Sequence, residues 1–254
     1  MRISILACVI ALGVAADGAA APAAEINAFI STAIKSATDE VLPVFERTNG
    51  HTIRASYAPS GALVPRFERG EPVDVFLTDA KALDALIGQG KVIGPRADLA
   101  RTGIGIAVKK GAPKPDVSTP DALRRALLAA KSVGHASPAG GSITGGHVMR
   151  MFEKLSIADQ ITPKTKLSMG GPNSRVSVLV SSGEAEIGLQ QASELLDNPD
   201  VEVIGMLPAQ LQQITTYSGG VTANAKQPDA ANALIAALMT PAAQAIFKAK
   251  GLGL

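Results

Sequence analysis

Short apolar runs alternate along the chain with stretches in which apolar residues recur every three to four positions. The apolar runs predict strands at residues 26–30, 52–58, 73–78, 102–108, 133–136, 166–169, 186–189, 201–207 and 214–222. The helical spacing predicts helices at residues 34–45, 80–87, 120–130, 174–182, 229–239 and 241–250, with shorter ones after Pro59 and before Leu155. Strands that alternate with helices in this way favour an α/β fold with largely parallel strands.

The same alternation indicates how the chain is divided. We expect two α/β lobes, with residues 24–104 and 216–254 in the first lobe and residues 105–215 in the second. The chain would cross between the lobes near residue 105 and return near residue 215. A single doubly wound domain would produce much the same pattern, so the pattern alone leaves both arrangements open.

The first 23 residues have the features of a cleavable signal peptide. Arg2 gives a positive start, residues 3–16 are almost wholly apolar, and Ala21-Pro22-Ala23 fits the small-x-small rule for signal peptidase. We therefore expect export to the periplasm. Cys8 leaves a lipoprotein as the alternative, although very little apolar sequence precedes it.

Composition excludes several classes of function. The net charge is only +2, aromatic residues make up 3% of the chain, and no basic run appears, so we expect no nucleic-acid partner. Cys8 is the single cysteine, and His51, His135 and His147 show no i, i+4 pairing, so we expect no metal site. The glycines at residues 140–146 match neither the dinucleotide fingerprint nor the P-loop, and we expect no cofactor.

Four loops share one character, because each follows a predicted strand, contains small polar residues or glycine, and opens a predicted helix. They lie at residues 31–33, 59–61, 141–145 and 170–174. Helix N-termini present unpaired N–H groups, and ligands of open α/β sheets bind at the carboxyl ends of strands. We therefore expect one shared anion site, although each Ser or Thr could equally serve as the N-cap of its own helix.

Three charged or titratable residues near these loops allow two interpretations each. Arg175 could hold a carboxylate through its guanidinium or form a surface salt bridge. His135 and His147 flank the third loop and could act as acid or base, or could be satisfied structural histidines.

Several motifs carry a family resemblance. They are Y-A-P-S-G-A-L at residues 57–63 and E-R-G-E-P-V-D-V-F-L-T-D at residues 68–79, with further likeness at residues 142–155, 183–189 and 241–251. The mature chain resembles the periplasmic molybdate-binding protein family of ABC importers, a family that also includes periplasmic aconitate isomerase. The resemblance implies a two-lobed type II periplasmic-binding-protein fold with two crossovers, and a ligand held by hydrogen bonds without a metal.

The pocket residues depart from the molybdate pattern. Ala33 stands where the family has its first-loop serine, Thr144 stands for an alanine, Asn173 for a valine and Gln191 for a tyrosine, whereas Ser60 matches. The resemblance, with these exchanges, implies a larger and less symmetric ligand such as an organic carboxylate. The expected ligand-binding residues are Ser31, Thr32, Ser60, Ser142, Thr144, Asn173, Ser174, Arg175 and Gln191.

The sequence is compatible with three functions. The first is a monomeric solute-binding protein that captures a small anion and delivers it to an ABC permease. The second is a cofactor-free aconitate isomerase, which would interconvert trans- and cis-aconitate with His135 and His147 as candidate catalytic residues. The third is a scavenging or sensing protein with the same cleft.

Overall fold

The computed structural model describes residues 23–169 and 175–253, so the predicted signal peptide lies outside the described residues except for Ala23. The elements in chain order are β1 (Glu25–Ser31), η1 (Thr32–Ile34), α1 (Lys35–Asn49), β2 (Thr52–Ala58), α2 (Ser60–Glu68), β3 (Val75–Asp79), α3 (Ala80–Gly88), β4 (Val92–Thr102), β5 (Ile104–Lys109), α4 (Pro120–Ala129), β6 (Val133–Ala136), η2 (Pro138–Gly140), α5 (Ile143–Lys154), α6 (Ala158–Ile161), η3 (Thr162–Lys164), β7 (Thr165–Ser168), α7 (Val176–Ser182), β8 (Ile187–Gln191), α8 (Ala192–Leu196), β9 (Val201–Met206), β10 (Thr215–Thr222), α9 (Pro228–Leu238) and α10 (Pro241–Ala249).

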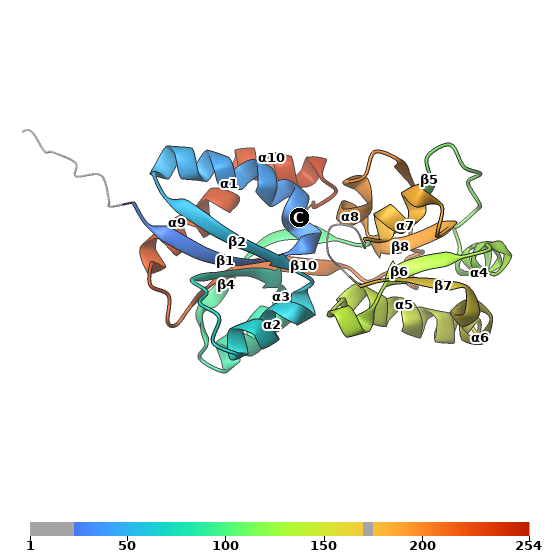
Figure 1. Ribbon diagram of the computed structural model, residues 1–254, viewed down its shortest axis with the longest axis horizontal. Helices are drawn as coiled ribbons and strands as arrows, with labels where there is room; N and C mark the ends of the chain where they lie inside the picture. The colour runs from blue at the N-terminus through green and yellow to red at the C-terminus, as the bar shows by residue number, and fades with distance from the viewer. Residues whose placement is uncertain (1–22, 170–174, 254) are drawn as a thin grey trace, which may run out of the picture.

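The elements form two sheets, each covered by helices on both faces (Figure 1). The first lobe contains the sheet β2-β1-β3-β10-β4, and the second lobe contains the sheet β7-β6-β8-β5-β9. This is the expected two-lobed α/β fold. The sheets are mixed, however, because β10 is antiparallel to β3 and β4, and β5 is antiparallel to β8 and β9. The expectation of largely parallel strands holds for four strands of each sheet. The fifth strand, which enters from the other lobe, runs against its neighbours.

Period-two alternation along the central strands builds the first lobe's two core layers. Ala28, Ile30 and Leu77 pack with α1, α9 and α10 on one face of the sheet. Phe29 and Phe76 point to the other face, where they pack with α2 and α3. Successive side chains of a strand face opposite sides, so a continuous apolar run supplies both layers at once.

The second lobe repeats this arrangement with a different set of helices. Ile106 and Leu189 pack against α4, α5 and α6 on one face of the sheet. Ala107 packs against α7 and α8 on the other face. Two separate cores leave each lobe able to move as a unit about the segments that join them.

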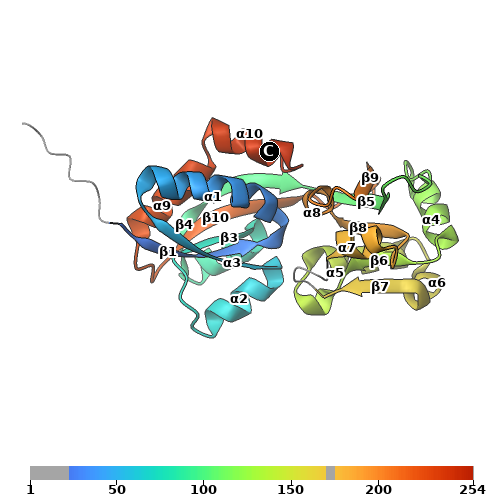
Figure 2. The same ribbon diagram turned by 45° about the horizontal axis from the view of Figure 1, so that its top comes forward.

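Two short segments join the lobes, one after β4 at Gly103 and one between β9 and β10 at residues 207–214 (Figure 2). The side chain of Gln212 ties them together. Its Oε1 accepts a hydrogen bond from Ile104 N at 2.8 Å, and its Nε2 donates to the Ile104 carbonyl at 3.0 Å. The two strand connections are therefore cross-linked at the point where the lobes meet.

Among the strands and α-helices of the described residues, three were not predicted from the sequence: β4, α6 and α8. Gly94-Pro95 and several charged residues interrupt the apolar pattern of β4, which lies at the edge of its sheet, where such residues are tolerated. Helices α6 and α8 span 4 and 5 residues, too few for a helical period to be recognised.

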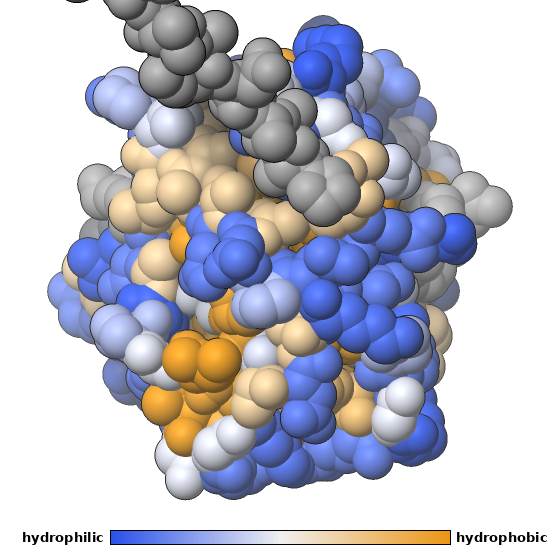
Figure 3. All heavy atoms as spheres, turned by 90° about the vertical axis from the view of Figure 1, so that its left-hand side faces the viewer, coloured by the Kyte–Doolittle hydropathy of each residue, from blue (hydrophilic) through white to orange (hydrophobic). Residues whose placement is uncertain are grey.

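The helices of the described segments differ from membrane spans in length or shape. No single helix among them is long and apolar enough to cross a bilayer. The pair α9 and α10 meets such a criterion by length and composition, but the two helices meet at 61°. Leu234 and Phe247 of this pair are fully buried in the first lobe's core. Figure 3 shows the far end of that lobe as a largely hydrophilic surface with smaller apolar areas.

Asp74, from the family motif before β3, connects three parts of the first lobe. Its Oδ2 accepts hydrogen bonds from Asn27 N at 2.8 Å and Asn27 Nδ2 at 3.1 Å, and its Oδ1 accepts from Lys226 N at 2.6 Å. The side chain is 2% exposed. The carboxylate thus holds β1 and the chain before α9 against β3.

We predict that Asp74→Ala lowers the free energy of unfolding by about 3 kcal/mol. It removes several hydrogen bonds to a charged group and leaves buried N–H groups without a partner. Urea titration followed by circular dichroism measures the change. As a control, Glu68→Ala removes an exposed ion pair with Lys91 and should cost under about 1 kcal/mol. Equal costs for the two variants would contradict the role given to Asp74.

Candidate functional site

A cavity of about 530 Å³ lies between the two lobes. The carboxyl ends of β1 and β2 open onto it from the first lobe, and those of β6, β7 and β8 open onto it from the second. Seven of the nine residues expected to bind the ligand line this cavity: Ser31, Thr32, Ser60, Ser142, Thr144, Arg175 and Gln191. Asn173 and Ser174 lie outside the described residues. The structure thus brings the first three predicted loops, and Arg175 after the fourth, to one place.

Two buried serines form the first lobe's wall. The Ser60 hydroxyl donates to Ser31 Oγ at 3.0 Å, and Ser31 Oγ accepts a longer bond of 3.4 Å from Ala33 N at the start of η1. They lie close together because Ser31 pairs with Ala58 in the parallel register of β1 and β2. Ser31 therefore caps its own short helix and also lines the cavity. It serves as an N-cap and as a cavity residue at once.

The second lobe's wall is built by the start of α5. Ser142 is the N-cap of this helix and accepts a hydrogen bond from Gly145 N at 3.2 Å. Thr144 follows in the first turn and is buried. The first N–H groups of a helix have no partner inside the helix and carry partial positive charge, which favours an anion at this end. Helix α5 spans 12 residues.

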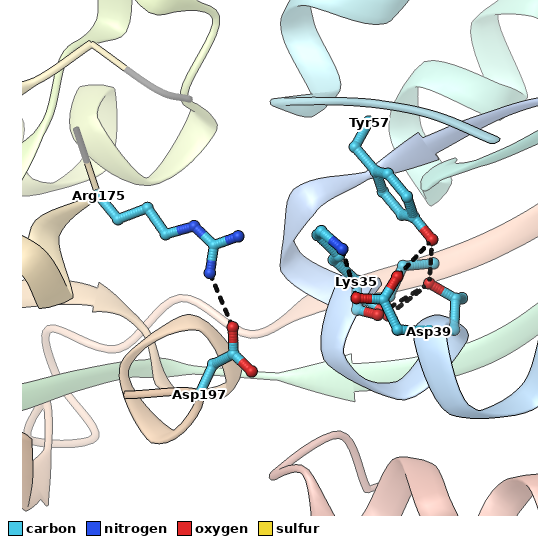
Figure 4. A network of polar contacts seen from close by, with 7 residues as sticks. Lys35, Asp39, Tyr57, Arg175 and Asp197 are labelled. Atoms are coloured by element: carbon cyan, nitrogen blue, oxygen red, sulfur yellow. Dashed lines mark hydrogen bonds and ion pairs between the residues drawn. The ribbon is translucent and has the colours of Figure 1, made fainter. Parts of the chain in front are cut away.

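Lys35 and Arg175 bring positive charge to the cavity from opposite lobes (Figure 4). The Lys35 ammonium contacts the Asp39 carboxylate and lies 4.5 Å from the centre of the Tyr57 ring. Arg175 Nη1 donates to Asp197 Oδ2 at 2.7 Å, and its side chain is 31% exposed. Arg175 therefore forms the salt bridge that was one of its two predicted roles while it lines the cavity.

Two adjacent glutamines at the end of β8 bring amide groups to the cavity wall. Gln191 is 1% exposed and donates from Nε2 to Thr215 Oγ1 at 3.1 Å, while its Oε1 has no hydrogen-bond partner among the described residues. Gln190 is 8% exposed, and its Oε1 also has no hydrogen-bond partner among the described residues. Buried polar atoms are nearly always satisfied, so these two amides are suited to meet polar atoms of a ligand.

The two histidines considered as catalytic residues do not line the cavity. His135 is 2% exposed, its ring stacks edge-on against Phe152, and its Nδ1 lies 3.0 Å from the Ala136 carbonyl. Burial lowers the pKa of His135, which favours the neutral ring. His147 Nε2 lies 2.7 Å from the Leu211 carbonyl. Both rings have structural partners in the second lobe.

Glu194 is the most consequential cavity residue that was not predicted from the sequence. It lies on α8, lines the cavity and is half-buried. Burial raises the pKa of Glu194 to about 7, against the opposing effects of a hydrogen bond from the Thr32 hydroxyl and of the nearby Arg175 charge. The strand predicted at residues 186–189 was its one sequence signal, because residues just after the end of such a strand face the ligand edge of the sheet.

Direct contacts between the lobes close the cavity. Gly61 N, at the start of α2, donates to the Gly141 carbonyl at 3.0 Å. The Ser193 hydroxyl donates to the Ala33 carbonyl at 2.7 Å. Within the described segments, no group of three or more His, Cys, Asp and Glu residues is placed to hold a metal ion.

Comparisons with known proteins agree with this architecture. The model of the bacterial extracellular solute-binding protein family matches residues 26–253. An aconitate isomerase from Pseudomonas sp is 34% identical over 241 residues, 92% of this chain and 89% of that protein. The molybdate-binding protein ModA of Azotobacter vinelandii is 26% identical over 260 residues, 100% of both chains. A solved structure of the periplasmic molybdate-binding protein of that organism has a TM-score of 0.72 at 19% identity, covering 90% of this chain and 99% of that one, and shares the fold.

We predict that Gly61→Ala weakens ligand binding by opposing closure. A Cβ at this position would lie 2.8 Å from the Gly141 carbonyl oxygen. Overpacking typically costs about 1–3 kcal/mol, which corresponds to roughly 5- to 150-fold in affinity. Calorimetric titration measures the affinity, and small-angle scattering should show a more open average shape.

Gly88→Ala is the matched control, because no atom lies within 4 Å of a Cβ built at Gly88. It should leave both the affinity and the scattering profile unchanged. Wild-type affinity in Gly61→Ala would contradict the closure contact.

Proposed function

Because the chain belongs to the bacterial extracellular solute-binding protein family, we propose that it captures a small organic anion with two or more carboxylate groups. The observation that carries this proposal is the placement of Lys35 and Arg175 on opposite walls of one cavity. A guanidinium binds a carboxylate through two parallel hydrogen bonds, and an ammonium binds one as a point charge. A ligand with carboxylates at both ends can contact both cations.

The size and polarity of the cavity support an organic anion over a tetrahedral oxyanion. A volume of about 530 Å³ falls within the range of roughly 300–1,000 Å³ that is usual for sites of organic ligands. Gln191 stands where the molybdate-binding pattern has a tyrosine, and the amide oxygens of Gln190 and Gln191 have no partner among the described residues. A hydroxyl or a protonated carboxyl of an organic ligand could donate to such an oxygen, whereas a fully deprotonated oxyanion could not.

The available donors are sufficient for micromolar affinity. The serines at 31 and 142, together with Lys35 and Arg175, supply four donor side chains, since the Ser60 hydroxyl donates to Ser31. Hydrogen bonds to charged groups contribute about 1.5–3 kcal/mol each, against about 8 kcal/mol for a micromolar complex. The hydrogen-bond free energy beyond that figure offsets the translational and rotational entropy that the ligand loses and the free-energy cost of closing the lobes.

The proposed place of action is the periplasm. The signal-peptide features of residues 1–23 and the extracellular family support export. The relatives named as molybdate-binding proteins support delivery of the ligand to an ABC permease. A monomer, as expected from the sequence, is part of the same proposal.

A second candidate function is the isomerisation of aconitate, an unsaturated tricarboxylate. The 34% identical relative is named an aconitate isomerase, and it aligns over 92% of this chain. The structure adds a titratable carboxyl, that of Glu194, in the wall of the proposed carboxylate site. An isomerase and a binding protein would share the same closed cavity.

We predict that di- and tricarboxylates raise the melting temperature, whereas molybdate and sulfate do not. A ligand at 100 times its Kd stabilises the folded state by about 2.7 kcal/mol. Differential scanning fluorimetry with a panel of anions makes the measurement. Stabilisation by molybdate alone would contradict the proposal.

Arg175→Gln is the variant to compare with the wild type in this screen. It should lower the affinity for carboxylates at least tenfold. Arg54→Gln should have no effect, because Arg54 is exposed on β2 and pairs with Glu25. A melting temperature close to that of the wild type confirms that each variant is folded.

We predict that the purified protein converts trans-aconitate to cis-aconitate without an added cofactor. Chromatography of the two isomers over time makes the measurement, with protein denatured by heat as the control. Binding of trans-aconitate without any conversion would support the solute-binding function and overturn the isomerase.

A further inference from the structure

Helix α8 fixes Glu194 at the junction of the two lobes. The helix begins directly after β8, and the Ser193 hydroxyl donates to the Ala33 carbonyl in the opposite lobe at 2.7 Å. The hydroxyl of Thr32, also in that lobe, hydrogen-bonds the Glu194 carboxylate. Closure of the lobes therefore places this carboxyl at a defined point of the cavity wall.

Charged and titratable groups surround Glu194 on several elements. Arg175, just before α7, attracts the carboxylate, and Asp197, beyond the end of α8, repels it. Asp197 itself is paired with Arg175 at 2.7 Å, and Lys250 lies near Asp197. Tyr217 of β10 is a further neighbour and is fully buried. Burial outweighs the attraction to Arg175 and raises the pKa of Glu194 to about 7.

The other titratable side chains of the cavity are poorly suited to exchange a proton near neutral pH. The Tyr57 hydroxyl donates to Asp39 Oδ1 at 2.9 Å, and burial raises its pKa. Burial raises the pKa of Tyr217 as well, and the Arg175 guanidinium is paired with Asp197. The Lys35 ammonium is paired with Asp39. Among the described residues that line the cavity, Glu194 is the one carboxyl.

We propose that Glu194 is the catalytic residue that moves a proton between two carbons of a bound unsaturated tricarboxylate. The inference rests on the isomerase as the function of this site. It assigns the role of acid and base to a residue on α8, in place of the two histidines that the sequence suggested.

The proposed step balances without an oxidant or a cofactor. The Glu194 carboxylate takes a proton from the CH₂ carbon that lies between one carboxylate and the double bond. The C–H electron pair forms a new double bond to the central carbon, and the original double-bond pair moves onto the far carbon, where its carboxylate delocalises the charge. The Glu194 carboxyl then returns the proton to that far carbon, so the double bond has shifted by one position.

The walls of the cavity are arranged to stabilise the charge that develops in this step. Lys35 and Arg175 line the cavity from opposite lobes, and the Ser31 hydroxyl, which accepts a hydrogen bond from Ser60, lines it as well. Fixed donors and charges aimed at developing charge in a closed site are the usual source of large rate gains. A carboxyl whose pKa is close to the working pH is well matched to both halves of the transfer.

The test compares Glu194→Gln with the wild type for turnover and for binding of trans-aconitate. We expect kcat to fall about 100- to 10,000-fold, the usual contribution of a general acid–base, with the Kd changed less than fivefold. Glu194→Asp keeps the carboxyl and should retain more activity than Glu194→Gln. Glu184→Gln, an exposed residue bonded to Ser182 and outside the cavity lining, is the control and should match the wild type.

Two further readouts separate proton transfer from a structural role. The wild-type kcat/KM should rise with pH through about 7, since the carboxylate is the active form, and this step should be lost in Glu194→Gln. With trans-aconitate deuterated at the CH₂ carbon, the wild type should turn over more slowly and should carry deuterium to the far carbon of the product, because one carboxyl takes and returns it.

The possible failures can be told apart. Turnover by Glu194→Gln within threefold of the wild type overturns the role of Glu194 alone. A wild type that binds trans-aconitate without turnover overturns the isomerase and this inference together. A wild type that does not bind any carboxylate overturns the proposed function itself.

Discussion

The site depends on the direct approach of two separately folded lobes. Gly61 N and the Gly141 carbonyl meet at 3.0 Å, and a side chain at either glycine would collide with the backbone of the opposite lobe. This backbone contact brings the starts of α2 and α5 to the same cavity. Without it, the loops at the strand ends would belong to two unrelated surfaces. Closure is therefore the constraint that turns two sets of helix starts into one site.

The charges of the cavity are arranged around this closure. Each cation has an anionic partner, Lys35 with Asp39 and Arg175 with Asp197. These pairs keep the walls from repelling each other, since two unpaired cations across a partly buried cavity would oppose the approach of the lobes. Glu194 is held between the lobes by Thr32 and Arg175, so its protonation state is coupled to the same contacts. The same residues therefore affect ligand binding, closure of the lobes and the protonation of Glu194.

Sequence alone predicted most of the fold because its strongest signals are local. The apolar runs at residues 26–30 and 73–78 and the helical spacing at residues 120–130 were enough to place β1, β3 and α4. The direction of β10 and β5 could not be predicted in the same way, because it depends on which lobe the chain has come from. Strand β4 was missed because an edge strand tolerates Gly94-Pro95 and charged residues.

The candidate site was predicted where its residues sit in loops between a strand and a helix. Ser31, Ser60 and Thr144 follow that rule and line the cavity. His135 and Glu194 show the limit of the rule, because whether a side chain faces a core or a cleft depends on tertiary packing. His135 packs against Phe152, whereas Glu194, in a helix too short to predict, faces the cavity.

A crystal structure of the protein with trans-aconitate tests the shared interlobe site most directly. We expect one ligand between the lobes, with one carboxylate on Arg175, another within reach of Lys35, and the Gly61–Gly141 contact intact. A ligand bound to one lobe alone, or outside this cavity, would contradict a site built by closure.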